Sequence, residues 1–336
     1  MKYSIGYNFN KKLINYFSKL NKKNNNLIFE VFFAVKGGYL GGARYYDLPK
    51  TSFEEAEKQV KLLKKNSFKI NYLINTSYCP DLKNKKVETK VKEYFSWVES
   101  IKPDIVTVAN EKIMFFLEKF FPSLKINASI VFGLKTVKQV NDLRKKHPNL
   151  ARITLHQSVN RDKKLLIKQI KNAKSKKYTP VEIELLANEI CLYMCPKMKE
   201  HYYYNGIKSF KGAKKHINVF ESYCTKKRIS NPIHFLNSTF IRPEDVSIYE
   251  KLGVDIIKLS GREAPSNYLK LISRAYLTKK YEGNVMNLFD ARYWPDNNPP
   301  YIKNINLRIF LKYLWKNNLK KLERIPKKYL KMWTYK

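Results

Sequence analysis

The sequence has few cysteines, few acidic residues and no long apolar run. No stretch of about 18 apolar residues occurs, so the sequence predicts no membrane-spanning helix. The first residues, MKYSIGYNFNKK, lack the apolar core of a secretory signal. Both absences lead us to expect a cytoplasmic protein. Its four cysteines would then stay reduced and serve as ligands, nucleophiles or core residues.

Several familiar catalytic motifs are also missing. The chain contains no glycine-rich phosphate loop, no serine nucleophile elbow and no HExxH zinc motif. These absences give no support to a dinucleotide-binding fold, a serine hydrolase or a zinc peptidase of the common type. No long linker rich in Pro, Gly or Ser divides the 336 residues, which can form one large domain.

The charge is strongly one-sided, with 66 Lys and Arg residues against 28 Asp and Glu and a formal net charge of +38. A nucleic-acid partner such as RNA is one interpretation. Genome composition is the other, because only 11 of the basic residues are Arg and the chain is rich in Asn, Ile, Tyr and Phe, which A/T-rich codons encode. Lys also lacks the bidentate fork with which Arg reads bases.

Apolar runs alternate with amphipathic stretches along most of the chain. We expect eight strands, at residues 27–35, 69–75, 104–110, 126–132, 151–157, 181–188, 233–241 and 254–262. A helical pattern follows seven of them, for example TSFEEAEKQVKLLKK, whose Ser/Thr and Glu form a capping signature. Repeated βα units favour a parallel sheet, and eight in roughly 250 residues favour a closed (β/α)₈ TIM-like barrel. A doubly wound sheet is the alternative.

The segments outside these units are predicted to be additions to the barrel. Residues 2–9 are expected to form an extra strand, followed by a short helix, within an N-terminal extension of residues 1–25. The barrel is expected over residues 26–280, with a cysteine-bearing insertion at 189–230. Residues 281–336 are expected to form a C-terminal extension whose basic helix, INLRIFLKYLWKNNLKKL, docks on the barrel. Contact of this helix with RNA or a membrane surface is the alternative.

One face of several predicted strands is polar. Glu182 and Glu184 share a face, and Lys258 and Arg262 share a face of the last strand. The outer face of a barrel strand packs on helices, so these polar faces should point inward, where an unpaired charge is costly. Glu182 or Glu184 should therefore pair with Lys258, Arg262 or Arg152.

Two interpretations of the polar interior remain open. It is either a structural network that fills the barrel or a lined pocket for a polar or anionic ligand. Active sites of such barrels lie at the C-terminal ends of the strands. If there is a pocket, Asn75, His156, Asn188 and Arg262 are therefore better candidates than residues deeper in the strands.

All four cysteines should lie at the same pole of the barrel. Cys79 follows the second expected strand, Cys191 and Cys195 follow the sixth, and Cys224 precedes the seventh. Cysteine-only ligation suits zinc or an iron–sulfur cluster, although a Cys-x3-Cys spacing is unusual for structural zinc. The alternatives are unrelated thiols, or a nucleophilic thiol with His201 as its base.

Five stretches of the chain resemble the collagenase-like peptidase family, peptidase family U32, in its short single-barrel form. They are GGARYYDLP, INYLINTSYC, IELLANEICLYMCPKMKEH, IRPEDVSIYEKLGVDIIKLSGR and AYLTKKYEGN, in the order of the family and over most of residues 27–285. The resemblance implies a TIM-like barrel and a cysteine-bound four-iron, four-sulfur cluster. Characterised relatives use such a cluster in oxygen-independent hydroxylation of ubiquinone precursors or RNA bases, some with prephenate as oxygen donor. Other relatives carry the peptidase name.

The resemblance also implies roles for particular residues. The matching cluster ligands are Cys79, Cys191, Cys195 and Cys224. Family members often have a further cysteine shortly after the position of Cys224, where Arg228 and its neighbours stand here. Cys79 must therefore join the others if the cluster has four protein ligands.

Three further positions match the family. His201 matches the histidine of the CP…H segment, and Lys258 and Arg262 match the Lys and the GR of the last strand. We therefore predict an iron–sulfur enzyme, with zinc as the alternative metal. Lys258, Arg262 and the additional candidate His156 would hold a small anionic co-substrate. Peptidase activity is the second prediction, and an RNA-binding or RNA-modifying protein is the third; the sequence does not select the acceptor.

Overall fold

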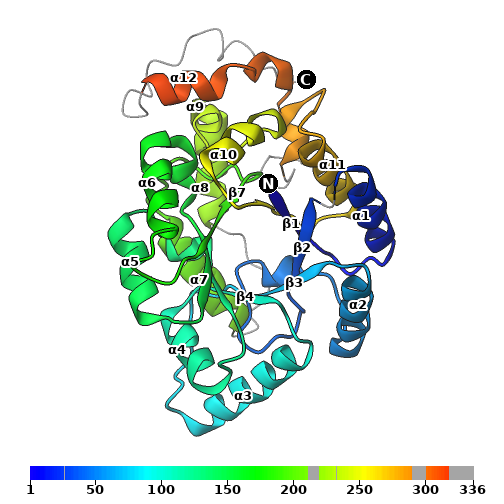
Figure 1. Ribbon diagram of the computed structural model, residues 1–336, viewed down its shortest axis with the longest axis vertical. Coiled ribbons are helices and arrows are strands. Elements are labelled where there is room, and N and C mark those ends of the chain that lie inside the picture. Colours follow the sequence, from blue (N-terminus) through cyan, green and yellow to red (C-terminus); the bar gives the residue numbers. More distant parts are fainter. Residues whose placement is uncertain (26, 211–218, 232, 290–299, 318–336) are drawn as a thin grey trace.

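The computed structural model describes residues 1–25, 27–210, 219–231, 233–289 and 300–317 (Figure 1). Eight parallel strands pair in chain order and form a closed barrel, in which β8 pairs with β1. The strands are β1 (Lys2–Gly6), β2 (Ile28–Phe33), β3 (Lys69–Ile74), β4 (Ile105–Val108), β5 (Ile126–Ala128), β6 (Leu150–Thr154), β7 (Glu182–Leu186) and β8 (Ile256–Leu259). The predicted TIM-like (β/α)₈ fold is confirmed.

Helices surround the barrel and alternate with its strands (Figure 1). They are α1 (Lys12–Lys23), α2 (Phe53–Lys65), α3 (Lys85–Ser100), α4 (Glu111–Phe120), α5 (Val137–Lys146), α6 (Lys163–Ala173), α10 (Val246–Leu252) and α11 (Ser266–Leu277). Their starts follow the expected capping chemistry. Ser52 accepts a hydrogen bond from the Glu55 backbone N–H, and Thr136 forms a capping box with Gln139. No helix of the described residues is long and apolar enough to span a membrane.

The first strand belongs to the barrel, so the predicted N-terminal extension of residues 1–25 is wrong. β1 pairs with β2 on one side and with β8 on the other, and Tyr3 and Ile5 are fully buried. With α1 it forms the first βα unit. Its five residues include the polar Ser4 and the small Gly6, so its apolar pattern is weak in the sequence.

The strand predicted at 233–241 is also wrong, although the barrel has the predicted number of eight strands. This segment begins with the short helix α9 (Ile233–Leu236) and continues as irregular chain before α10. Its apolar residues Phe235 and Phe240 are buried in a second core, separate from the barrel core, together with Phe289 and Phe310. The apolar residues of this segment therefore pack in the second core and do not belong to a barrel strand.

The described part of residues 281–336 packs on the barrel. Helix α12 (Phe310–Asn317) places Leu311 in the main core, and Leu314 lies in the second core. The buried Arg242 guanidinium holds this segment by donating hydrogen bonds to the backbone oxygens of Asn304 (3.0 Å) and Arg308 (3.3 Å). Residues 290–299 and 318–336, including the last five residues of the predicted basic helix, lie outside the described residues.

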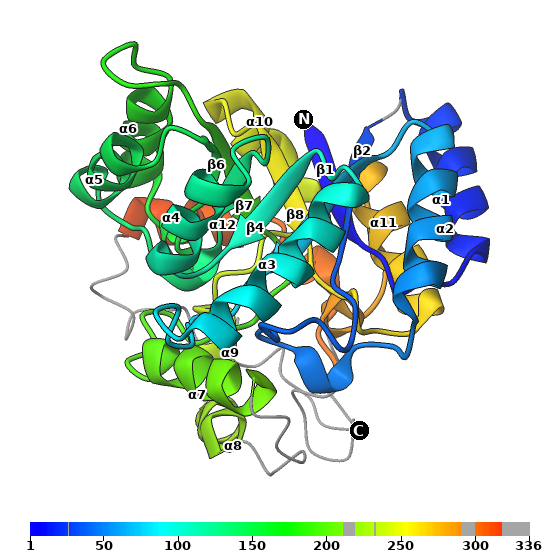
Figure 2. The same cartoon turned by 90° about the horizontal axis from the view of Figure 1, so that it is seen from below.

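Two helices cover one end of the barrel. They are α7 (Met198–Phe210) and α8 (Val219–Ser230), within the predicted insertion at 189–230. Figure 2 shows them at the end of the barrel opposite the chain's N-terminus. Because β1 starts at that terminus and all strands are parallel, α7 and α8 cover the C-terminal ends of the strands. This is the end at which barrel enzymes carry their active sites.

Candidate functional site

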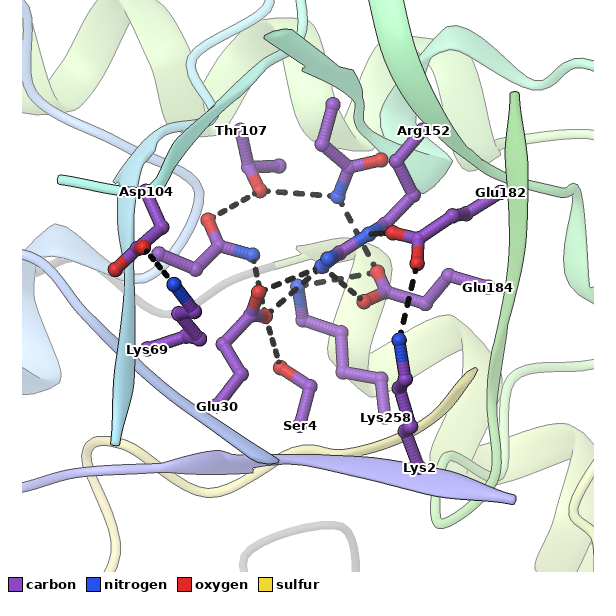
Figure 3. A network of polar contacts seen from close by, with 12 residues as sticks. Lys2, Ser4, Glu30, Lys69, Asp104, Thr107, Arg152, Glu182, Glu184 and Lys258 are labelled. Atoms are coloured by element: carbon purple, nitrogen blue, oxygen red, sulfur yellow. Dashed lines mark hydrogen bonds and ion pairs between the residues drawn. The ribbon is translucent and has the colours of Figure 1, made fainter. Parts of the chain in front are cut away.

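A network of charged and polar side chains fills the barrel interior (Figure 3). The buried Glu30 carboxylate accepts hydrogen bonds from Ser4 Oγ (2.6 Å), Asn71 Nδ2 (2.9 Å) and Arg152 Nη1 (2.8 Å). Arg152 also donates from Nε to Glu182 Oε2 at 3.0 Å. The strand register explains these contacts, because Ser4 lies beside Glu30 and Arg152 lies beside Glu182.

Glu184 joins this network to the last strand. Its carboxylate accepts hydrogen bonds from Thr154 Oγ1 (2.6 Å) and Lys258 Nζ (3.3 Å), and Arg152 Nη1 lies 3.4 Å away. Burial acts to raise the pKa of Glu184, but the Lys258 and Arg152 charges outweigh it and lower this pKa. The predicted pairing of Glu184 with Lys258 and Arg152 is confirmed, and the network favours the structural interpretation of the interior.

Asn75 and Asn188 connect loops at the C-terminal end of the barrel. Asn188 Nδ2 donates to the Ser260 carbonyl oxygen at 2.9 Å, and its Oδ1 accepts from the Ser260 backbone N–H at 2.6 Å. Asn75 Oδ1 accepts from the Ala43 backbone N–H at 3.4 Å. Both side chains therefore hold backbone that surrounds the site.

His156 caps the short helix that follows β6. The ring Nδ1 accepts a hydrogen bond from the Ser158 backbone N–H at 3.1 Å and lies 2.7 Å from Ser158 Oγ. Burial, with a smaller contribution from Lys135, lowers the pKa of His156 to about 4. At neutral pH the ring is therefore uncharged, with its proton on Nε2. It can donate a hydrogen bond to a ligand but adds no positive charge.

Three of the four cysteines influence one another. Cys191 and Cys195 lie in the loop after β7, and Cys224 lies on α8. Hydrogen bonding with Cys224 lowers the pKa of Cys195 to about 6. The pKa of Cys224 is raised, mainly by the same interaction and by burial, and the Cys195 and Cys191 charges act in the same direction. A loop and a helix that are distant in sequence thus bring Cys195 and Cys224 into contact, and Cys191 is near enough for its charge to act on Cys224.

The interactions of Cys79 involve different neighbours. Its thiol packs at the edge of the main core and donates weakly to the Pro80 carbonyl oxygen. Burial raises its pKa to about 11, and the charges that act on it are those of Lys112 and Asp81. Whether Cys79 is a ligand stays a prediction, since its described partners are not the other three thiols.

Two arginine charges act on the thiols: Arg228 acts on all three, and Arg44 acts on Cys191. Arg228, which stands where many family members have a cysteine, is buried and donates to the Ile190 carbonyl oxygen at 3.1 Å. Burial and the Glu189 charge raise the pKa of Cys191 to about 11, while Arg228 and Arg44 act in the opposite direction. Sequence reasoning noted Arg228 only as a missing cysteine and did not single out Arg44.

Arg44 links three loops at this pole. Its Nη2 lies 2.9 Å from Glu189 Oε1, and its Nη1 lies 3.0 Å from Glu263 Oε1. Ser260 Oγ donates to the same Glu189 oxygen at 2.6 Å. Sequence reasoning missed this group, although Arg44 and Glu189 both occur in stretches that carry the family resemblance. Their pairing depends on the closure of the barrel, which no local pattern shows.

The other two predicted site residues also lie at this pole. The His201 ring stacks on Phe220 with ring centres 5.3 Å apart, and burial followed by the Arg44 charge lowers its pKa to about 4. Arg262 follows β8 and is 6% exposed. The predicted pairing of Arg262 with Glu182 or Glu184 is wrong, because the strand ends before this residue and the charges near it are those of Glu263, Arg44 and Glu189.

We tested whether these residues suit the cluster that the resemblance implies. Among the described residues, no three His, Cys, Asp or Glu side chains are arranged as ligands of a metal ion. The donor atoms are nevertheless those that bind such clusters, because Cys195 and Cys224 are hydrogen-bonded and the Cys191 and Arg228 charges act on Cys224. The agreement with an iron–sulfur cluster therefore rests on the residue type, since cysteine thiolates are the usual ligands of such clusters.

The fold and the C-terminal end of the barrel together define a class of protein. It is a closed (β/α)₈ barrel in which two helices cover charged residues and thiols at this end. The chain belongs to Peptidase family U32, which it matches over residues 17–286. It is 28% identical over 282 residues to the "Uncharacterized protease MJ1657" of Methanocaldococcus jannaschii, covering 83% of this chain and 80% of that protein. Membership in a peptidase family indicates an enzyme.

A solved structure of the family has the same fold. "The Structure of the U32 Peptidase Mk0906" superimposes with a TM-score of 0.54 at 12% identity, over 79% of this chain and 95% of that chain. At this identity the likeness shows the fold alone. The reaction of the present chain has to be argued from its own residues.

Proposed function

We propose that this protein is an iron–sulfur-dependent enzyme that performs an oxygen-independent hydroxylation, or a related group transfer, on an acceptor not yet identified. The observation that carries the proposal is the hydrogen-bonded pair of Cys195 and Cys224, with Cys191 near enough for its charge to act on Cys224, at the end of the barrel where active sites lie. Family membership supports it, because the resemblance implies a cysteine-bound cluster.

One charge near the three thiols, that of Arg228, favours bound thiolates, while burial raises the pKa of Cys191, and hydrogen bonding with Cys195 and burial raise that of Cys224. Cysteine binds metal as the thiolate, and each thiolate adds a negative charge to a buried site. Arg228 acts to lower the pKa of all three thiols, which favours their charged form. A bound cluster would supply redox or Lewis-acid chemistry that no side chain of the chain can supply. Zinc is the alternative metal for the same thiols.

The described helices would protect such a centre. Helix α7 packs closely on the loop after β2, since a Cβ atom at Gly41 would overlap Ser209 Oγ. Ser209 Oγ also accepts a hydrogen bond from the Gly42 backbone N–H at 3.1 Å. These contacts hold α7 over the pole and help to exclude water from it.

Metal analysis of the full-length protein tests the proposal. We expect anaerobically purified protein to be brown and to contain iron and acid-labile sulfide. Cys191→Ser, Cys195→Ser and Cys224→Ser should each lose most of the iron, because each removes one of three thiolate ligands. Cys79→Ser is the matched control and should keep it, because its partners are Pro80, Lys112 and Asp81. Circular dichroism of each variant checks that the fold is retained.

Other results would contradict the proposal. Colourless protein that contains zinc, or no metal, would exclude the iron–sulfur reading. Full iron content in any one of the three variants would remove that thiol from the ligand set. Equal loss in Cys79→Ser would instead support four cysteine ligands, as the resemblance implies.

Peptidase activity is a second candidate, favoured by the name of the family and by the partly exposed Cys195 thiol. A thiol that ligates a metal is not free to attack a peptide bond. The peptidase reading therefore requires metal-free protein to cleave peptides and to lose this activity when Cys195 is alkylated.

A further inference from the structure

Three glutamines are buried among the described residues, and the amide of one of them contacts sulfur rather than oxygen. They are Gln59, Gln157 and Gln169. In Gln59 and Gln169 the amide nitrogen donates to a backbone carbonyl oxygen, at 3.1 and 2.7 Å. In Gln157 the amide nitrogen lies 3.8 Å from Met198 Sδ, and the side chain forms a hydrogen bond with Cys191. Sulfur therefore takes the place that oxygen has at the other two glutamines.

The other end of this amide, its carbonyl oxygen, is unsatisfied within the described part of the chain. Gln157 is 2% exposed, and Oε1 is buried with no hydrogen-bond partner there. An unpaired buried carbonyl costs stability, which an apolar side chain of similar size would avoid. Packing alone therefore does not account for a glutamine at this position. Its N–H donors do, because a cysteine thiolate is a charged acceptor and forms a stronger hydrogen bond than a neutral group.

The backbone brings Gln157 and Cys191 together from neighbouring strands. Gln157 is the first residue of the short helix Gln157–Arg161 that follows β6, and Cys191 lies in the loop after β7. Asn160 of this helix donates from Nδ2 to the carbonyl oxygen of Leu186, the last residue of β7, at 3.0 Å. Arg228 Nη1 donates to the carbonyl oxygen of the residue before Cys191 at 3.1 Å. Both loops are therefore held in place independently of the Gln157 amide.

We propose that Gln157 is a positioning residue, whose amide N–H donates to Cys191 Sγ and holds this sulfur as a thiolate ligand of a metal centre. The inference deepens the proposed function, on which the identity of the metal rests. An N–H···S hydrogen bond stabilises negative charge on sulfur without adding a charge to the site. Partners of this kind orient a ligand and strengthen metal binding. They also raise the reduction potential of an iron–sulfur cluster, because the reduced cluster carries more negative charge.

The charges around Cys191 explain why such a donor is needed. Burial and the Glu189 carboxylate raise the pKa of Cys191 to about 11, which disfavours the thiolate. Three groups act in the opposite direction: Gln157 through its hydrogen bond, and Arg228 and Arg44 through their charges. Arg44 is paired with Glu189 itself. Without the Gln157 amide, the sulfur would lose the hydrogen bond that offsets its desolvation.

Binding of Co²⁺ to the full-length, reduced and metal-free protein tests this proposal, with thiolate-to-cobalt charge-transfer absorbance as the signal. Gln157→Leu should weaken Co²⁺ binding by at least about tenfold. It should not lower the free energy of unfolding of the metal-free protein, because the unpaired carbonyl is removed together with the donors. Gln157→Asn should also weaken binding, since its amide is one methylene too short to reach the sulfur.

Gln169→Leu is the matched control. Gln169 is equally buried and also has an Oε1 atom without a partner among the described residues, but its amide donates to the Lys135 carbonyl oxygen. This variant should lower the Tm and keep the wild-type affinity for Co²⁺. In protein purified with its cluster, a redox titration followed by electron paramagnetic resonance gives a second measurement. Gln157→Leu should lower the reduction potential, and Gln169→Leu should not change it.

Each contrary result overturns the proposal. Wild-type Co²⁺ affinity in Gln157→Leu would remove the hydrogen bond from metal binding, and equal weakening in Gln169→Leu would reduce it to a packing effect. Full affinity in Gln157→Asn would show that direct contact with the sulfur is not required. A wild-type protein that binds no Co²⁺ through thiolates would overturn both this inference and the proposed function.

Iron and sulfide measured on the purified protein separate the two ideas. Iron-free protein whose affinity for Co²⁺ falls in Gln157→Leu refutes the proposed function alone. Iron-bearing protein in which Gln157→Leu changes neither the Co²⁺ affinity nor the reduction potential refutes this inference alone.

Discussion

At the scale of single residues, His156 shows how burial and one hydrogen bond determine the charge at the mouth of the barrel. Nδ1 accepts the Ser158 backbone N–H, so a proton on this atom would break the cap of the following helix. The folded protein therefore disfavours the imidazolium form. The Arg262 guanidinium is a better candidate than His156 for a positive charge that binds an anion, because it stays protonated at any ordinary pH.

Acid destabilisation can be predicted from His156. Its pKa is about 4 in the folded protein against 6.5 for the ordinary side chain, so between these values only the unfolded chain binds the proton. The contribution to stability is complete above pH 6.5 and is lost as the pH falls to about 4, by at most about 3 kcal/mol.

Urea unfolding of His156→Asn over the pH range from 7 down to 4 measures this contribution. The Asn side chain keeps an acceptor for the Ser158 N–H but does not titrate, so the free energy of unfolding should fall less steeply with acid than in the wild-type protein. Parallel curves for the two proteins would show that His156 titrates normally in the fold.

The limits of sequence reasoning are also visible at this scale. Alternation along strands correctly indicated that Arg152 and Lys258 pair with glutamates inside the barrel, because a two-residue period places side chains on one face. The contacts of Arg44 and Arg228 were missed because they join segments far apart in the chain. Arg44, for example, meets Glu189 across 145 positions of sequence. No local period reports such a contact.

At the scale of elements, most βα units could be predicted because their helices carry clear amphipathic patterns and caps. The two errors compensated for each other: β1 was placed outside the barrel, and the segment 233–241 was counted as a strand. Apolar alternation shows only that a segment is buried on one side. It does not show whether barrel strands or the second core, around Phe235 and Phe240, cover it.

Deleting residues 1–10 should therefore destroy the fold rather than trim an extension. The deletion removes β1, which pairs with β2 and β8, and leaves both neighbours with an unpaired edge. We expect loss of the cooperative thermal transition in circular dichroism. Lys2→Ala, at the exposed end of the same strand, is the control and should unfold as the wild-type protein does. A normal thermal transition in the truncated chain would show that residues 1–10 are not required for the fold.

At the scale of the whole molecule, the excess of basic residues is too large for the protein to neutralise. Even if each of the 28 acidic residues neutralised one basic residue, 38 of the 66 positive charges would remain. Several acids are in fact shared between two cations: Glu184 contacts Arg152 and Lys258, and Glu250 contacts the N-terminal ammonium and Lys279. Non-specific attraction to polyanions follows from this charge alone, whatever its evolutionary origin.

Salt-dependent binding separates genome bias from a specific RNA partner. If the Lys-rich composition has no dedicated role, labelled single-stranded RNA and heparin should bind comparably, and both affinities should fall by at least about tenfold between 50 and 200 mM salt. Fluorescence anisotropy of the full chain measures this directly. Arg262→Met should leave both curves unchanged, because its buried fork cannot reach an extended phosphate backbone. An RNA sequence whose binding survives high salt while heparin is released would instead identify RNA as the acceptor, since base contacts lose little affinity when counterions are added.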